Sequence, residues 1–202
     1  MVSAPSNAPN CSEPLCAEPL LAVLIGPGGV GKGTIARRLT EKDPRLWLSR
    51  SWTTRAQRES ETGDEYVFVD RETFEQAIDE GRFLEWTQFH GNLYGTPVPT
   101  DTGGADVLLE IEVQGAEQVR RHYDDVVIFL IVPPSMDQLE ARLRGRGDTE
   151  DHVQRRLHST ANEMRIGERL ATHVIVNDDV ERATGEILSI LETLRRDRRS
   201  LA

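Results

Sequence analysis

Short apolar runs alternate with amphipathic stretches along the chain from residue 20 onward. Runs typical of strands that are buried on both faces occur at 20–25, 106–113, 126–132 and 173–176, with a weaker one at 46–51. Apolar residues recur at helical spacing over 31–42, 71–81, 114–123, 135–145, 150–164 and 180–196. This alternation predicts an α/β fold of three layers, with helices on both faces of a mostly parallel sheet.

The stretch from 49 to 98 breaks this alternation. It contains a short strand-like segment, EYVFVD, together with two aromatic clusters and several turn signals. We therefore expect a small mixed subdomain inserted into the core.

The two ends of the chain differ from the rest. Residues 1–18 carry three prolines and little apolar periodicity, which is typical of a disordered tail, and its Cys11 and Cys16 are interpreted as free thiols. The tail lacks the basic start and apolar stretch of a secretory signal, and no run is long enough to span a bilayer. We therefore expect a cytoplasmic protein without a membrane partner. The final RRDRRSLA is expected to be a frayed, solvated helix end.

Charge narrows the class of ligand. Acidic residues outnumber basic ones by 34 to 24, which gives a formal net charge of -10. A polyanion would be repelled by such a surface, so no nucleic-acid partner is expected. A small anion needs only a few well-placed donors, so nucleotides remain compatible with this charge.

The segment GPGGVGKGT follows the first predicted strand and opens a predicted helix. Glycine torsions let successive backbone N–H groups point at phosphate oxygens, the helix adds its positive N-terminal end, and Lys32 adds a point charge. This context indicates a nucleotide-binding loop rather than an ordinary glycine-rich turn. The predicted ATP-binding residues are Gly26, Pro27, Gly28, Gly29, Val30, Gly31, Lys32, Gly33 and Thr34.

The loop lacks one familiar metal ligand. Gly33 stands where such loops usually carry a serine or threonine that contacts Mg²⁺. We therefore expect no direct protein ligand. The Mg²⁺ that accompanies ATP is expected to be held by phosphates and water, with Thr34 as a weaker donor.

The inserted stretch supplies a second set of polar residues. It begins with SRSWTTRAQR, in which Arg55 and Arg58 are three residues apart beside several hydroxyl groups. Two guanidinium groups can clamp one phosphate through forked, charge-assisted hydrogen bonds. Further along the stretch lie Tyr66, Glu85, Tyr94 and Thr96. Taken alone, Glu85 and the tyrosines would be interpreted as a surface carboxylate and core aromatic residues.

Together with the segments that follow, these motifs resemble the guanylate kinase family. Its marks occur in order from residue 20 to about 190 as GPGGVGKGT, S-x-TTR-x-x-R, Tyr66, FLEW…GNLYGT, LLEIEVQGA, PPS, LRGRG, RRL and VNDD. The resemblance implies a P-loop core at 19–48, 99–139 and 161–202, a GMP-binding insert at 49–98 and a helical lid at 140–160. It also implies transfer of the γ-phosphoryl group of ATP to GMP, which yields GDP and ADP.

The resemblance also implies roles for individual residues. Those that hold the phosphate of GMP are matched by Arg55, Arg58, Tyr66 and Tyr94, and those that read its base by Ser51, Glu85 and Thr96. The catalytic set, which stabilises charge on the transferred group, is matched by Lys32, Arg142, Arg146 and Arg156. Contacts near adenine are matched by Asn177 and Asp178. We expect Arg144 and Arg155 to be solvated.

The base-reading residues suit guanine on chemical grounds. Guanine presents two adjacent donors on its Watson–Crick edge, which the Glu85 carboxylate can accept together, whereas adenine presents an acceptor at the same ring nitrogen. The hydroxyl of Ser51 or Thr96 can donate to guanine O6. Such a site discriminates strongly, because the wrong base leaves buried polar atoms unpaired.

The chain departs from the family pattern beside the acceptor pocket. Glu112 replaces the usual Asp of the EIDVQG motif, so its carboxylate would reach about one C–C bond further into the GMP site. Glu110 keeps its acidic position and is expected to order metal-bound water. Prolines and glycines fill 97–105, where the family carries a longer helical connection, so no helix is expected there.

Two other interpretations stay open. The chain could be a non-catalytic guanylate-kinase-like binding module, although such modules tend to lose residues that this chain keeps, such as Lys32, Arg146 and Arg156. It could also be a related kinase for another phosphorylated acceptor, which the shortened 97–105 favours and the base-reading set opposes. The expected partners are ATP and GMP, with Mg²⁺ as cofactor, in a monomer or a homodimer.

Overall fold

A computed structural model of the chain describes residues 19–57, 63, 66–89, 91–145 and 149–201. Two predicted site residues, Arg58 and Arg146, lie outside these ranges, as does the predicted tail with Cys11 and Cys16. None of the helices described is long and apolar enough to cross a membrane.

The central layer is a parallel sheet of five strands in the order β2-β7-β1-β8-β9. Its strands are β1 (Leu21–Ile25), β2 (Leu46–Leu48), β7 (Asp106–Glu110), β8 (Val127–Val132) and β9 (His173–Val176). Each lies within a predicted apolar run. The run at 106–113 leaves the sheet after Glu110, however, because Glu112 becomes the N-cap of the next helix. The strand predicted there is therefore too long.

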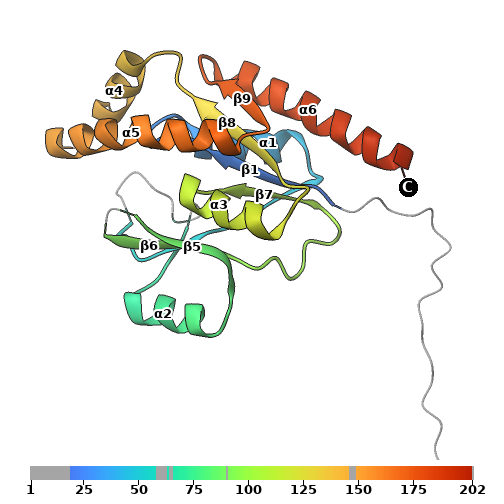
Figure 1. Cartoon of the computed structure of the whole chain (residues 1–202), viewed down its shortest axis with the longest axis horizontal. Helices are drawn as coiled ribbons and strands as arrows, with labels where there is room; N and C mark the ends of the chain where they lie inside the picture. The colour runs from blue at the N-terminus through green and yellow to red at the C-terminus, as the bar shows by residue number, and fades with distance from the viewer. Residues whose placement is uncertain (1–18, 58–62, 64–65, 90, 146–148, 202) are drawn as a thin grey trace, which may run out of the picture.

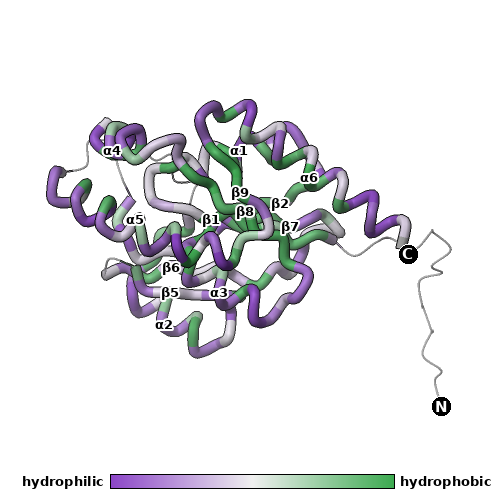
Figure 2. Tube along the Cα trace, turned by 45° about the horizontal axis from the view of Figure 1, so that its top comes forward, coloured by the Kyte–Doolittle hydropathy of each residue, from purple (hydrophilic) through white to green (hydrophobic). Residues whose placement is uncertain are grey.

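Side chains of the central strands pack alternately into two buried clusters, one on each face of the sheet. In β1, Leu24 joins the first cluster, whereas Val23 and Ile25 join the second. The first cluster is completed by α1 (Lys32–Lys42), α4 (Met136–Arg144) and α6 (Val180–Leu201), the second by α3 (Val113–His122), and both by α5 (Glu150–Leu170). Figure 2 shows the strands as a hydrophobic centre within helices whose outer surfaces are hydrophilic. The predicted three-layer α/β/α core is confirmed (Figure 1).

The C-terminal helix differs from the expected frayed, solvated end. α6 continues to Leu201, and Arg195 within it is 8% exposed. Its guanidinium donates to Asp43 Oδ2 and to Asp106 Oδ2, each at 2.6 Å. The expectation is therefore wrong for Arg195, because helical periodicity turns this side chain inward, where two carboxylates pair with it.

Between β2 and β7 the chain forms a second sheet of four strands in the order β4-β3-β6-β5. Its strands are β3 (Trp52–Thr53), β4 (Val67–Phe68), β5 (Phe83–Phe89) and β6 (Asn92–Pro97), and α2 (Arg71–Asp79) packs on it through stacking of Phe74 on Phe83. Only β3 and β4 pair in parallel, so the inserted sheet is mixed, as predicted. In Figure 1, α3 lies between the two sheets, and it contacts strands of both.

The connection from β6 to β7 contains no helix, as the prolines and glycines predict. Gly103 and Gly104 form a turn in it, with φ angles of 60° and 81°. Only glycine adopts such torsions readily, so the sequence here is suited to a turn and unsuited to a helix.

Candidate active site

The predicted phosphate-binding loop joins the carboxyl end of β1 to the start of α1. Gly26 has a φ of 143°, and a Cβ there would lie 2.2 Å from the carbonyl oxygen of Ile131, so only glycine fits. Gly31 is the N-cap of α1, and no side chain caps this end of the helix. Its first N–H groups are therefore suited to an anion. Lys32 is 7% exposed, and its Nζ donates to the carbonyl oxygen of Gly26 at 2.7 Å.

Two residues that were predicted to contact ligands form hydrogen bonds to the backbone of this loop. Nδ2 of Asn177 and Nη1 of Arg142 donate to the carbonyl oxygen of Val30, at 2.7 Å and 3.2 Å. Arg142 also donates to the carbonyl oxygen of Asn177 at 2.9 Å. These bonds tie α4 and the end of β9 to the loop. The roles of both residues toward ATP stay predictions.

Arg156, on α5, lies over the same loop. A Cβ on Gly28 would be 2.6 Å from its Nη1. Its Nε is buried and has no hydrogen-bond partner among the residues described. A guanidinium group beside the loop suits a phosphate ligand. Arg144 and Arg155 are exposed, as predicted, and Arg144 pairs with carboxylates of its own surface.

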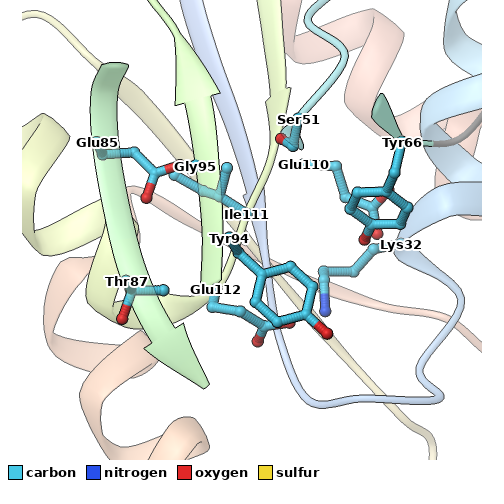
Figure 3. A pocket seen from close by; sticks show the side chains of 10 residues that line it. All are labelled: Lys32, Ser51, Tyr66, Glu85, Thr87, Tyr94, Gly95, Glu110, Ile111 and Glu112. Carbon is cyan, nitrogen blue, oxygen red and sulfur yellow. The ribbon is translucent and has the colours of Figure 1, made fainter. Parts of the chain in front are cut away.

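A pocket opens between this loop and the inserted sheet (Figure 3). Residues from both sides line it: Lys32 of α1, Ser51, Tyr66, Glu85, Thr87, Tyr94 and Gly95 of the insert, and Glu110, Ile111 and Glu112 at and just after the end of β7. The structure thus brings together residues that the sequence assigned separately to donor and acceptor. Thr87 was not predicted, although strand alternation places it on the same face as Glu85.

The three predicted base-reading residues form one hydrogen-bonded cluster. Oγ1 of Thr96 donates to Oε1 of Glu85 at 2.6 Å and lies 3.1 Å from Oγ of Ser51. All three side chains are buried. Burial raises the pKa of the Glu85 carboxyl to about 7, although the hydrogen bond from Thr96 opposes this, and the charge of Glu112 raises it further. The cluster therefore offers one titratable acceptor beside two hydroxyl groups.

Aromatic rings surround the predicted phosphate clamp. The guanidinium carbon of Arg55 lies 5.6 Å from the ring centre of Tyr66 and 5.5 Å from that of Phe68. The rings of Tyr66 and Tyr94 meet edge to face at 6.2 Å. The negative charge of Glu110, followed by burial, raises the pKa of Tyr66, so its phenol stays protonated as a donor. Arg58, the other predicted clamp residue, lies outside the residues that the structure describes.

One buried acid near the site was not predicted from the sequence. Glu163 of α5 is 3% exposed, and its Oε2 has no hydrogen-bond partner within the described part of the chain. Burial raises its pKa, and its charge interacts with Glu112, Lys32 and Arg156. Its only signal in the sequence is an acidic residue at a core-facing position of an amphipathic helix.

Glu110 is the residue best placed to assist a metal ion. A Cβ on Gly33 would lie 3.2 Å from its Oε2, so the carboxylate lies beside the first turn of α1. Carboxylate oxygen is a ligand that Mg²⁺ accepts, often through water. Within the described ranges, no group of three or more His, Cys, Asp or Glu side chains is arranged to hold an ion directly.

Fold and site together define an α/β P-loop protein in which an inserted sheet faces the loop across a polar pocket. More narrowly, the chain belongs to the guanylate kinase family, whose model matches residues 19–194. The guanylate kinase of Parasynechococcus marenigrum (strain WH8102) is 48% identical over 81% of this chain and 92% of its own length. That of Rubrobacter xylanophilus is 44% identical over 86% and 94%.

A solved structure agrees with these relatives. The crystal structure of guanylate kinase from Anaplasma phagocytophilum superposes with a TM-score of 0.73 at 33% sequence identity. The match covers 89% of this chain and 87% of that one.

Proposed function

We propose that the protein is a guanylate kinase, which transfers the γ-phosphoryl group of ATP to GMP and releases GDP and ADP. The observation that carries this proposal is the Glu85–Thr96–Ser51 cluster, because its Glu85 and Ser51 line the same pocket as the loop lysine, Lys32. One pocket thus combines a base-reading acceptor with a phosphate-binding cation.

On the acceptor side, the ionised Glu85 carboxylate accepts from N1 and the 2-amino group of guanine, and a hydroxyl of the cluster donates to O6. Tyr66, Tyr94, Arg55 and Arg58 hold the phosphate. Adenine would place an acceptor against the Glu85 carboxylate. Binding it would leave buried polar atoms unpaired, which supports discrimination by several orders of magnitude.

On the donor side, backbone N–H groups of the loop and Lys32 hold the ATP phosphates. Mg²⁺, bound with ATP, would neutralise negative charge on the phosphate groups. We infer that Glu110 and Thr34 orient its water ligands, which fits the position of the Glu110 carboxylate beside Gly33.

The transfer needs alignment and charge neutralisation more than covalent chemistry. An oxygen of the GMP phosphate forms a bond to the γ-phosphorus as the bond from that phosphorus to the β,γ-bridging oxygen of ATP breaks, and ADP leaves. Lys32, Arg142, Arg146 and Arg156 stabilise the negative charge during this step. The position of Arg156 Nη1 beside Gly28 of the loop supports its part in this.

A coupled ADP-release assay tests the proposal with ATP and Mg²⁺ and a panel of acceptors: GMP, dGMP, AMP, IMP, UMP and a ribose bisphosphate. We expect turnover on GMP to exceed turnover on AMP by about a hundredfold or more. Replacement of Lys32 by Ala should abolish it.

Other outcomes separate the alternatives. Binding of GMP without phosphorylation of any acceptor would contradict the kinase and favour a binding module. Phosphorylation of the ribose bisphosphate in preference to GMP would retain the phosphate clamp but overturn the guanine site.

A further inference from the structure

Gly115 lies buried in the first turn of α3, between the two sheets. Glycine inside a helix is less stable than alanine, because it loses more backbone freedom on folding. The backbone of Gly115 is helical and does not adopt a positive φ, so its torsions do not demand glycine. The reason for glycine must therefore lie in the space around it.

That space is filled by Glu85. A Cβ on Gly115 would lie 2.3 Å from Oε2 of Glu85, 2.8 Å from its Cδ and 3.4 Å from its Cγ. These are the three nearest heavy atoms, so the Glu85 side chain alone sets the limit at this position. The first two distances are well inside van der Waals contact.

Glu85 has little freedom to retreat from such a contact. Its side chain is 4% exposed, and its carboxylate is bonded to Thr96 at 2.6 Å. α3 also holds the adjoining main chain, because Nε2 of Gln118 donates to the carbonyl oxygen of Trp86 at 2.7 Å. A methyl group at position 115 would therefore displace the Glu85 carboxylate from its present position while the strand stays in place.

We propose that Gly115 is a specificity-determining positioning residue for the base of the acceptor. By leaving no side chain at the start of α3, it lets the Glu85 carboxylate lie deep enough to bond to Thr96 and face the pocket. This inference rests on the proposed function, because it takes Glu85 as the acceptor for the guanine edge. Gly115 itself acts only through Glu85.

Replacement of Gly115 should affect the binding of the acceptor and not that of ATP. The loop that holds ATP is built from β1, α1 and the contacts of α4, and none of the three atoms nearest the position 115 Cβ belongs to it. A loss at position 115 should therefore appear in the affinity for GMP and leave the affinity for ATP intact.

Steady-state kinetics of Gly115→Ala test this, with Gly185→Ala as a matched control. Gly185 is a glycine of α6 with no heavy atom within 4 Å of its Cβ position. We expect Gly115→Ala to raise KM for GMP by about tenfold or more, while KM for ATP changes by less than about twofold. Its preference for GMP over IMP, which lacks the 2-amino group, should also fall. Equal KM values for GMP in the two variants would overturn the proposal.

Thermal unfolding gives a readout that does not depend on activity. Gly115→Ala should lower Tm in the wild-type chain. In a Glu85→Ala background the contacting atoms are absent, so the same change should raise Tm, because alanine is the better helix former. An equal shift in both backgrounds would overturn the Gly115–Glu85 contact.

The two possible failures are distinguishable. If the wild-type protein does not phosphorylate GMP, the proposed function and the specificity role of Gly115 both fall. If GMP is phosphorylated but the reversal of the Tm shift is not seen, only the inference about Gly115 is overturned.

Discussion

Glu85 shows how one residue can meet two opposing demands. Burial between α3 and β6 gives its carboxylate a fixed position, and the same burial disfavours its charge. The pKa of about 7 means that the free protein holds Glu85 partly neutral near neutral pH. A guanine edge, which offers only donors to this group, requires the ionised form.

This leads to a prediction about pH. Because the pKa of Glu85 is raised from 4.5 to about 7, its carboxyl is protonated below that pH and ionised above it. We expect kcat/KM for GMP to fall by about tenfold per pH unit below about pH 7, since kcat/KM reports groups of the free enzyme. KM for ATP should stay nearly constant over the same range.

Glu85→Gln provides the control for this pH profile. The variant should bind GMP weakly at all pH values and show no inflection near pH 7. The same inflection in wild type and Glu85→Gln would show that another group titrates.

At the scale of elements, the phosphate-binding loop depends on neighbours as well as on its own glycines. The carbonyl oxygen of Val30 is the common acceptor for Arg142 and Asn177, which belong to α4 and to the segment after β9. Asn177 is 2% exposed, so its bond to the loop is shielded from water. The segment after β9 thus acts as a brace for the loop.

Asn177→Leu should loosen this brace, because leucine has a similarly branched side chain but no amide group to donate. We expect KM for ATP to rise severalfold and the free energy of unfolding to fall by roughly 1–2 kcal/mol, since one buried hydrogen bond is lost while Arg142 still satisfies the carbonyl. KM for GMP should change little. The measurements are steady-state kinetics and urea denaturation.

Asn162→Leu is the matched control, because Asn162 is exposed on α5 and bonds only to Arg165 among the interactions described for it. It should behave as wild type. An equal rise in KM for ATP in both variants would refute the bracing role.

At the scale of the whole molecule, a buried ionic cluster joins distant parts of the chain. Arg195 of α6 pairs with Asp43, the C-cap of α1, and with Asp106 at the start of β7. Asp106 also accepts from the backbone N–H of Leu20 at 2.7 Å. The cluster therefore fastens the last helix to the end of α1, to the start of β7 and to the residue that precedes β1.

Arg195→Met should leave the buried Asp106 carboxylate without its cation and Asp43 with Arg45 alone. We expect the free energy of unfolding to fall by roughly 3 kcal/mol at neutral pH. Arg196→Met, a change of the exposed neighbouring residue, should shift it by less than about 0.5 kcal/mol. Equal stability of the two variants in urea denaturation would contradict this account.

The ion pair between Arg195 and Asp43 also makes the free energy of unfolding depend on pH. Burial alone would raise the pKa of Asp43, but hydrogen bonds from Arg45 and Arg195 outweigh it and lower the pKa from 3.8 to about 2. A carboxyl group whose pKa is lower in the folded chain than in the unfolded chain stabilises the fold at pH values above its unfolded pKa. This contribution is lost as the pH falls through the folded pKa of about 2. The difference between wild type and Arg195→Met should therefore shrink in acid.

The sequence predicted those features that depend on local pattern. Apolar runs located the five central strands, and glycine spacing with Lys32 located the loop. The resemblance identified Ser51, Glu85 and Thr96 as candidate base-reading residues. The structure places them in one hydrogen-bonded cluster.

What the sequence could not predict depends on contacts between distant elements. The burial of Arg195 follows from two carboxylates far away in the chain. The reason for glycine at position 115 lies in a side chain of another strand. Local propensity carries no information on such contacts.

The central claim is that one pocket accepts GMP and rejects other nucleotides, and direct competition tests it most simply. GMP and AMP are offered together at equal concentration with Mg²⁺ and ATP labelled at the γ-phosphate, and the labelled diphosphates are separated. The product ratio equals the ratio of the two kcat/KM values. The account predicts labelled GDP in excess of labelled ADP by about a hundredfold or more. Comparable amounts of the two products, or no labelled GDP, would contradict it.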